Sequence, residues 1–297
     1  MIKIEGTHIS RMILDRIKAD VSKLTKGKKV VPPQLVVFSV SPDDATLSFL
    51  KSKQKAVEYI GGSFKLLRFS KNIRFEELAK KLSEINQDSL SHAIIIQQPL
   101  PAALSTMTIF DFVSPEKEIE AYKAKPLFES PVALSVLTIL KAMFIPDALT
   151  DYEILKLDLE KDPAILKAIM RKKKIVLVGR GQTAGKPIAD VLSRLHMPFV
   201  NINSKTVNPE QFISEADIVI SAVGKPVIHE AHVKEGAALI SVGLRSENGK
   251  WLGDYNFEQI KDKSLAYTPT PGGVGPVTVA YLVSNMIKAW KMQNNLE

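Results

Sequence analysis

The chain contains no cysteine among its 297 residues. It therefore has no disulfide, no thiolate nucleophile and no cysteine-ligated metal. Only five histidines are present, and His229 and His232 are the only two spaced closely enough to share a helix face. No third metal ligand is apparent near that pair, so a solvated helix start is favoured over a metal site.

Long apolar runs are also missing. No stretch approaches the roughly 20 apolar residues that a membrane-spanning helix needs, and the N-terminal sequence lacks a signal-peptide pattern. Hydrophobic residues make up 45% of the chain, which is typical of a globular protein. We therefore expect a cytoplasmic protein with no membrane partner.

The charge is unbalanced toward the basic side, with a formal net charge of +8. Such a surplus admits nucleic acid as a partner, but the basic residues are spread over amphipathic segments and are not interleaved with aromatics. The basic runs Lys26–Lys29 and Arg171–Lys174 each precede an expected strand. We interpret both as solvated edges and expect no nucleic-acid partner, although small anions would gain from the same field.

Helical and buried-strand patterns alternate in the first half of the chain. Apolar residues recur at helical spacing after residue 7, and Leu35–Val40 is a nearly continuous apolar run, typical of a strand buried in a parallel sheet. The expected elements are helices over 7–26, 45–59, 75–85 and 131–143 and strands over 35–40, 64–69 and 93–97. Their β-α-β-α-β order predicts a parallel sheet.

The same alternation restarts in the second half. The expected elements are strands over 175–178, 199–202, 217–221 and 237–242, a helix beginning near 186–187 and a final helix over 277–292. Between the halves, residues 145–172 are charged and suit an exposed helical connector.

The prediction is an α/β protein of two α/β domains around a cleft, the C-terminal one a Rossmann-like, doubly wound parallel sheet. The first domain covers 1–147 and is completed by 277–297, and the second covers 148–276.

A glycine-rich turn joins the strand over 175–178 to the next helix. Gly179, Gly181 and Gly185 are spaced G-x-G-x-x-x-G. In a strand-turn-helix unit, such glycines let backbone N–H groups approach a pyrophosphate at the positive helix end. The spacing departs from the commoner G-x-G-x-x-G, so an ordinary tight turn is the alternative.

The end of the next strand indicates which dinucleotide binds. An acidic residue there would hold the ribose 2′-hydroxyl of NAD, but Asn201–Thr206 contains no carboxylate. Arg180, Ser204 and Lys205 are instead suited to surround a 2′-phosphate. NADP is therefore favoured over NAD.

The stretch Tyr267–Thr278 combines three prolines with three glycines and leads into the last helix. Proline fixes φ, whereas glycine permits close backbone approaches, so the stretch is suited to place backbone atoms against something. An ordinary loop between domains is the alternative.

Together these segments resemble the bifunctional methylenetetrahydrofolate dehydrogenase/methenyltetrahydrofolate cyclohydrolase family. The matching segments are Ser52–Ala56, Ile94–Pro101, Val178–Pro187, Ala222–Pro226, Val233–Gly236, Glu247–Lys250 and Thr270–Thr278. They cover nearly the whole chain in the family's order. The resemblance implies oxidation of 5,10-methylenetetrahydrofolate by hydride transfer to a nicotinamide, hydrolysis of the methenyl product to 10-formyltetrahydrofolate, a role in one-carbon metabolism and purine biosynthesis, and a homodimer.

The resemblance also implies roles for individual residues. Lys53 matches the family's catalytic lysine, and Gln97 matches its hydrogen-bonding glutamine. A lysine in a desolvated site beside a cationic intermediate is suited to relay a proton to or from the attacking water. The remaining positions are Phe49, Glu120, Pro271, Gly272 and Gly273 for the folate substrate, and Gly179, Arg180, Gly181, Gly185, Ser204, Lys205, Leu244 and Thr278 for NADP.

Three departures from the family pattern fall in the first domain. Phe49 replaces a tyrosine, and Glu120 replaces the aspartate that grips the pterin amide and amino edge. Ala121 follows where the family has a glycine, and Ser130–Ala133 departs from the family's Thr-Pro-x-Gly. The alternatives are therefore a dehydrogenase that has lost the cyclohydrolase step and a non-catalytic dinucleotide-binding homologue. Without the resemblance, Lys53 would be one solvated lysine among Lys51, Lys53 and Lys55.

Overall fold

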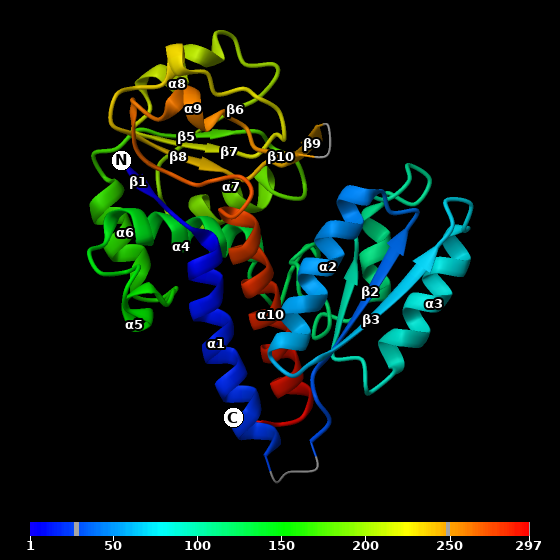
Figure 1. Ribbon diagram of the computed structural model, residues 1–297. Coiled ribbons are helices and arrows are strands. Elements are labelled where there is room, and N and C mark those ends of the chain that lie inside the picture. The colour runs from blue at the N-terminus through cyan, green and yellow to red at the C-terminus, as the bar shows by residue number, and fades with distance from the viewer. Residues whose placement is uncertain (27–29, 248–249, 297) are drawn as a thin grey trace. The chain divides into compact units, whose positions relative to one another are not determined.

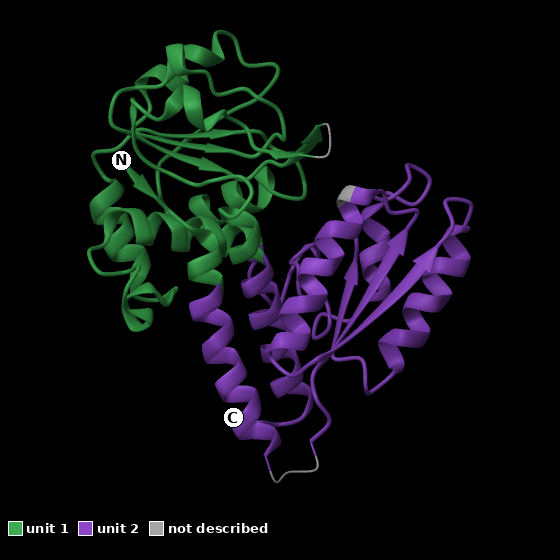
Figure 2. Cartoon of the chain, in the orientation of Figure 1, with its two compact units in different colours: residues 1–10, 132–278 green, residues 11–131, 279–297 purple. Residues whose placement is uncertain are grey.

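A computed structural model describes residues 1–26, 30–247 and 250–296. They form two compact units, shown in Figure 2 and named here after the number of strands in their main sheets. The sheet-6 unit consists of residues 1–10 and 132–278, and the sheet-3 unit consists of residues 11–131 and 279–297. The chain passes from one unit to the other inside the helices α1 (Gly6–Thr25), α4 (Pro131–Phe144) and α10 (Val274–Gln293). The structural break at 131/132 therefore lies before the domain boundary expected at 147/148, because most of α4 belongs to the sheet-6 unit. The functional assignment of the units stays a prediction.

The sheet-3 unit is built on a three-stranded parallel sheet in the order β3-β2-β4. Its strands are β2 (Gln34–Val40), β3 (Ser63–Phe69) and β4 (Ala93–Ile96), and its sheet helices are α2 (Asp44–Tyr59) and α3 (Phe75–Gln87). Figure 1 shows α2 and α3 on opposite sides of the sheet. The central strand β2 is buried from Leu35 to Val40, as its continuous apolar run predicts.

Local sequence explains where these helices begin and end. Asp43 caps α2 by accepting the backbone N–H of Thr46 at 2.7 Å. The helix ends at Tyr59, and Gly61 follows with φ at +85°, a backbone conformation that favours glycine. The expected elements of this unit therefore lie within one or two residues of the observed ones.

Beyond β4 the chain leaves regular structure but stays anchored. The 3₁₀-helix η1 (Met107–Phe112) packs Ile109 and Phe110 into the core under α3. The backbone returns to the sheet at Glu118, which forms a parallel bridge to Ile94. From α10, the side-chain amide of Asn285 donates to the carbonyl of Ile119 at 2.9 Å. These contacts hold the segment that carries Glu120.

The sheet-6 unit contains a parallel sheet in the order β1-β11-β8-β7-β5-β6. The strands are β1 (Ile2–Lys3), β5 (Ile175–Val178), β6 (Val200–Ile202), β7 (Ile218–Ser221), β8 (Ala237–Ser241) and β11 (Ser264–Tyr267). The helical segments are α7 (Gly185–Arg194), α8 (Pro209–Glu215), η2 (Glu230–His232) and α9 (Phe257–Ile260). Figure 1 shows helices above and below this sheet, with α8 above and α7 below in that view. The predicted α/β class and Rossmann-like parallel sheet are confirmed.

Several elements of this unit were not predicted. β1 is only two residues long, and β11 ends where the Pro/Gly stretch begins, so neither has a readable pattern. A short antiparallel pair, β9 (Arg245–Glu247) and β10 (Lys250–Leu252), follows β8. His229 and His232 flank and end η2 with ring centroids 6.3 Å apart.

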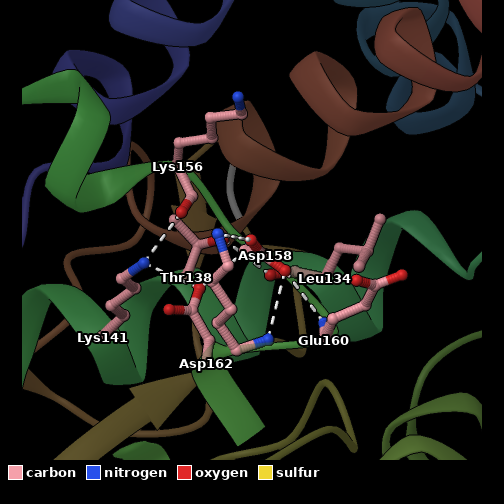
Figure 3. A network of polar contacts seen from close by, with 8 residues as sticks. Leu134, Thr138, Lys141, Lys156, Asp158, Glu160 and Asp162 are labelled. Carbon is pink, nitrogen blue, oxygen red and sulfur yellow. Dashed lines mark hydrogen bonds and ion pairs between the residues drawn. The ribbon is translucent and has the colours of Figure 1, made fainter.

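The segment 145–172 is less exposed than its charge predicts. It forms α5 (Tyr152–Leu155) and α6 (Asp162–Met170), and Leu155, Leu166 and Met170 are fully buried. Figure 3 shows the polar network that fixes it: the buried Lys141 of α4 donates to the Asp162 carboxylate and to the Lys156 carbonyl. The connector is therefore a folded part of the sheet-6 unit.

Among the described residues, no helix is long and apolar enough to cross a membrane. Part of the basic run Lys26–Lys29 and part of the matching segment Glu247–Lys250 lie outside the described residues.

Candidate active site

Lys53 is buried in the middle of α2, whereas its neighbours Lys51 and Lys55 are exposed. Only 8% of the Lys53 residue is accessible to solvent. The interpretation of Lys53 as a solvated lysine is therefore wrong. Phe49 is half-buried and lies one helical turn earlier, a spacing that places two side chains on the same helix face.

The amine of Lys53 is held by two side chains from other elements. Its Nζ donates to Gln97 Oε1 at 3.1 Å and to Glu120 Oε1 at 3.2 Å. Gln97 directly follows β4, and its backbone N–H donates to the Phe38 carbonyl, so the amide starts from a fixed point at the sheet edge. The structure thus brings together three of the predicted site residues, here called the lysine cluster: Lys53, Gln97 and Glu120.

The lysine cluster is suited to proton transfer. An amine that is buried and held by an amide oxygen and a carboxylate presents one proton-carrying group in a fixed direction. The Glu120 side chain is 17% exposed, so the pair remains in reach of a small molecule. Among the described residues, Glu120 Oε2 makes no hydrogen bond and is available to a ligand.

The conformation of the Glu120 segment is fixed by the preceding carboxylate. Glu118 accepts the backbone N–H of Glu120 at 2.9 Å and that of Tyr122 at 3.0 Å. Between them, Ala121 has φ at +66°, in the left-handed region that favours glycine. A glycine, which the family resemblance implies at this position, would adopt this conformation without strain, and the alanine here holds it with a side chain.

Glu118 is itself only 3% exposed. Burial, together with the nearby Glu120 carboxylate, raises its pKa to about 6 against the lowering effect of the backbone N–H groups. Glu118 is thus a buried acid directly beside the lysine cluster.

In the sheet-6 unit, the three glycines after β5 have three different surroundings. A Cβ on Gly179 would lie 2.7 Å from Val223 Cγ1, and its φ is +104°. A Cβ on Gly185 would lie 2.6 Å from the Gly179 carbonyl oxygen, whereas one on Gly181 would meet nothing within 4 Å. The first and third glycines permit the tight turn and the close start of α7, and the second leaves open space for a phosphate to approach the backbone.

The start of α7 is suited to an anion. No side chain caps this helix, and Arg180, Gly181 and Gln182 before it are exposed. The Lys186 N–H already donates to the Gly181 carbonyl at 2.9 Å and Pro187 has no N–H, so among the described residues the Gly185 N–H remains at the positive helix end to attract a phosphate. The backbone of this turn is fixed to the neighbouring strand β6, because the Gly179 N–H donates to the Ile202 carbonyl at 2.8 Å.

Beyond β6, residues 203–206 form a compact turn. The Asn203 side chain accepts the N–H of Lys205, and the Asn203 backbone N–H donates to Thr206 Oγ1. Ser204 and Lys205 are exposed at its tip. Because β5 and β6 are parallel neighbours, Arg180 and this turn lie at adjacent strand ends.

The Pro/Gly stretch lies against the beginning of the chain. The Gly272 carbonyl accepts the N–H of Thr7 at 3.1 Å, and a Cβ on Gly6 would lie only 1.7 Å from the Gly273 carbonyl oxygen. Pro271 is exposed and Gly273 is buried. The stretch therefore does place its backbone against another segment, the first turn of α1.

The two remaining predicted positions are also in the sheet-6 unit. Leu244 follows β8, and its carbonyl oxygen would lie 3.1 Å from a Cβ on Gly224. Thr278, in the first turns of α10, donates to Ser135 Oγ at 3.1 Å. Leu244 thus adjoins the loop after β7, while Thr278 is fixed to α4.

A parallel sheet with this glycine turn and an open helix start defines a Rossmann-like dinucleotide-binding protein that carries a second α/β unit with a buried lysine cluster. Residues 4–120 match the catalytic domain of the tetrahydrofolate dehydrogenase/cyclohydrolase family, and residues 164–294 match its NAD(P)-binding domain. The chain belongs to this family, so the predicted family and enzyme class are confirmed.

Individual relatives are similar to this chain over nearly its whole length. The Bifunctional protein FolD of Geobacillus thermodenitrificans is 34% identical over 288 residues, which is 96% of each chain, and that of Bacillus subtilis is 33% identical over 290 residues, 97% of each. Among solved structures, the bifunctional enzyme FolD of Campylobacter jejuni is 28% identical with a TM-score of 0.84, and the two chains are covered completely.

Sequence reasoning did not single out three residues that shape these sites. Glu118 lies in a segment already recognised, but its position two residues before Glu120 does not reveal that its carboxylate binds the backbone of that segment. Asn285 lies among buried apolar residues of α10, and no local signal marks it. Asp254, buried after β10, lies outside every segment that carried the resemblance.

Proposed function

We propose that the chain oxidises 5,10-methylenetetrahydrofolate with NADP and hydrolyses the methenyl product to 10-formyltetrahydrofolate. The observation that carries the proposal is the buried amine of Lys53, 3.1 Å from Gln97 and 3.2 Å from Glu120, in a chain of the dehydrogenase/cyclohydrolase family. A non-catalytic dinucleotide-binding protein has no use for such a group.

The lysine cluster supports the hydrolytic step. In that step water adds to the methenyl carbon and its oxygen becomes the formyl carbonyl, while one C–N bond breaks. Of the two protons that the water loses, one leaves to solvent, because the cationic substrate gives a neutral product, and the other reaches the departing nitrogen. Lys53 relays this proton, and Gln97 keeps its amine in place without adding charge. The dehydrogenase step needs no acid or base, because the hydride passes directly to the nicotinamide.

Glu120 is proposed to have two roles. Its Oε1 binds Lys53, and its Oε2 is available to the amino edge of the pterin. A carboxylate suits such an edge because charge-assisted hydrogen bonds to it are strong. The longer side chain of glutamate, compared with the family's aspartate, is consistent with reaching both partners from a segment held by Glu118.

The choice of NADP rests on the ends of β5 and β6. Arg180, Ser204 and Lys205 are exposed at these adjacent strand ends, and no carboxylate occupies the turn after β6. Cationic and hydroxyl groups there suit a 2′-phosphate, whereas NAD would require an acceptor for its 2′-hydroxyl.

We also propose a homodimer formed through the sheet-6 unit. β6 is an edge strand, and Val200, Val207 and Phe212 on and after it are 44%, 79% and 38% exposed. Burial of such residues would favour association. Sedimentation should find a dimer that Val207→Lys weakens, and a monomeric wild type would contradict the proposal. The cytoplasmic location stays a prediction, which cell fractionation tests.

The proposed function is tested by following the absorbance of the purified protein with 5,10-methylenetetrahydrofolate and NADP, with NAD in parallel. Samples quenched in acid measure the methenyl product, and unquenched samples measure its decay. Formation followed by enzyme-dependent decay is expected. Formation without accelerated decay would leave a dehydrogenase only, as the missing hydroxyl at Phe49 suggests, and no formation would contradict the proposal.

A further inference from the structure

Asp254 is a buried carboxylate in the sheet-6 unit that the proposed function does not use. It follows β10, and its exposed fraction is 0%. Within residues 1–26, 30–247 and 250–296, no lysine, arginine or histidine forms an ion pair with it. A buried carboxylate without a cationic partner is costly unless hydrogen bonds compensate it, so its partners identify what it holds.

Those partners are backbone N–H groups from two different loops. Oδ1 accepts the N–H of Lys225, in the loop after β7, at 3.0 Å, and Oδ2 accepts the N–H of Gly243, in the loop after β8, at 3.0 Å. The Ser221 hydroxyl, at the end of β7, and the backbone N–H of Gly224 also lie close to this carboxylate. One carboxylate therefore joins the loops at the carboxyl ends of two adjacent parallel strands.

The rest of Asp254 is fixed from the same direction. Its backbone N–H donates to Ser241 Oγ at 2.9 Å, and its carbonyl accepts the N–H groups of Val227 and Ile228, each at 3.1 Å. The space is closed, since a Cβ on Gly243 would lie 2.3 Å from Asp254 Oδ1. The carboxylate has no room to turn away from the two loops.

Both loops adjoin the predicted dinucleotide positions. Val223 and the Ala222 carbonyl oxygen would lie 2.7 Å and 3.0 Å from a Cβ on Gly179, so the loop after β7 touches the glycine turn. The loop after β8 carries Leu244, whose carbonyl oxygen would lie 3.1 Å from a Cβ on Gly224. Ligands of such sheets bind outside the carboxyl ends of the strands, where these loops lie.

We propose that Asp254 is a positioning residue for the dinucleotide, which sets the spacing between the loops after β7 and β8 through their backbone N–H groups. The inference rests on the proposed function in taking NADP as the ligand. It is independent of Lys53, which lies in the other unit. An asparagine in place of Asp254 would keep the volume but offer an NH₂ group to one of two N–H donors, and one loop would be released.

The test is calorimetric titration of Asp254→Asn with NADP, and with NAD in parallel. The expected result is a rise in Kd of about tenfold or more, as one lost charge-assisted hydrogen bond predicts. The KM for the dinucleotide should rise likewise, while the hydrolysis rate of added methenyltetrahydrofolate and its KM stay at the wild-type values.

Asp162→Asn is the matched control. Asp162 is a buried aspartate of the same unit, and within the described part of the chain its side-chain hydrogen bonds reach only Lys141 of α4 and Asp158 of the connector. It should lower the melting temperature without changing the Kd for NADP. Gly243→Ala is a second variant that displaces the same carboxylate from the opposite side, and it should reproduce the weakened NADP binding.

A Kd for NADP within twofold of wild type in folded Asp254→Asn would overturn the inference, as would equal weakening in Asp162→Asn, or a wild type that binds neither dinucleotide. Failure of the proposed function is a separate result. Wild-type protein that binds NADP but does not oxidise methylenetetrahydrofolate would refute that function, while the calorimetry would still decide the role of Asp254.

Discussion

One unit forms its candidate site from backbone groups, and the other forms its candidate site from side chains. In the sheet-6 unit the backbone forms the site, and Gly179, Gly181 and Gly185 matter through the side chains that they lack. In the sheet-3 unit side chains form the site, through Lys53, Gln97 and Glu120. A side chain added to a glycine of a backbone site takes space that the backbone or the ligand needs, whereas a side-chain site accommodates compensated changes, such as the pair Glu120 and Ala121.

The largest effect is expected from Lys53→Met, which tests the side-chain site. Hydrolysis of methenyltetrahydrofolate should fall by roughly 100-fold or more, because the proton relay is removed, while hydride transfer falls less. Acid-quenched and unquenched absorbance assays measure the two rates separately. Lys55→Met, on the exposed side of the same helix, is the control, and hydrolysis at the wild-type rate by Lys53→Met would refute the assigned role.

Gly185→Ala and Gly181→Ala separate the two uses of glycine in the backbone site. A Cβ at 185 would lie 2.6 Å from the Gly179 carbonyl oxygen. Gly185→Ala should therefore lower the free energy of unfolding by about 1–3 kcal/mol and weaken NADP binding. Gly181→Ala meets nothing within 4 Å, so only NADP binding should weaken.

Thermal unfolding and calorimetry measure the two effects. Equal losses of stability in the two variants would contradict the assignment of Gly185 to backbone packing and of Gly181 to ligand approach.

A pH effect of intermediate size is expected from Glu118. Because its pKa is raised to about 6 in the folded protein, the folded state binds this proton more tightly than the unfolded state does. Its contribution to stability is thus fully present below the unfolded value and is lost as the pH rises through about 6. A shift of this size corresponds to about 2 kcal/mol.

Melting curves between pH 4.5 and 7 compare wild type with Glu118→Gln. The difference in stability between the two proteins should change with pH across this window, in the direction of relatively lower wild-type stability at higher pH. Parallel curves would show that Glu118 does not titrate there.

The smallest effect is expected from Ala121→Gly. Because Ala121 has φ at +66°, a glycine should relieve the cost of the left-handed conformation and raise the free energy of unfolding by about 1 kcal/mol. Ala102→Gly, at an exposed alanine outside the positive-φ residues, should be neutral or destabilising. Destabilisation by Ala121→Gly would mean that Ala121 makes packing contacts that outweigh its strain.

Periodicity predicted the buried strands well and the edges poorly. β5 has the bounds expected from its apolar run, since a strand buried on both faces must be apolar throughout. β1 and β11 instead depend on pairing between the first and last parts of the sheet-6 unit, which no local pattern encodes. The charge of residues 145–172 predicted an exposed connector. That prediction failed because the charged Asp162 is buried against Lys141.

The parts of the candidate site that depend on local sequence could be predicted. The glycine turn is contained in seven residues, and its spacing, together with the strand before it and the α/β pattern after it, indicated a phosphate site. By contrast, the contact between Lys53 and Glu120 joins residues 67 positions apart, and Asp254 binds a loop 29 positions before it. Such contacts are set by the fold, so the sequence shows the residues without showing that they meet.

The division of the chain also has a consequence for biosynthesis. Each unit is assembled from separate pieces of the chain, and the sheet-3 unit needs residues 279–297. Trp290 and Gln293 of α10 donate to the carbonyls of Val31 and His92, so these early segments lack their partners until α10 leaves the ribosome. The lysine cluster therefore belongs to a unit that a nascent chain can complete only after α10 has been synthesised.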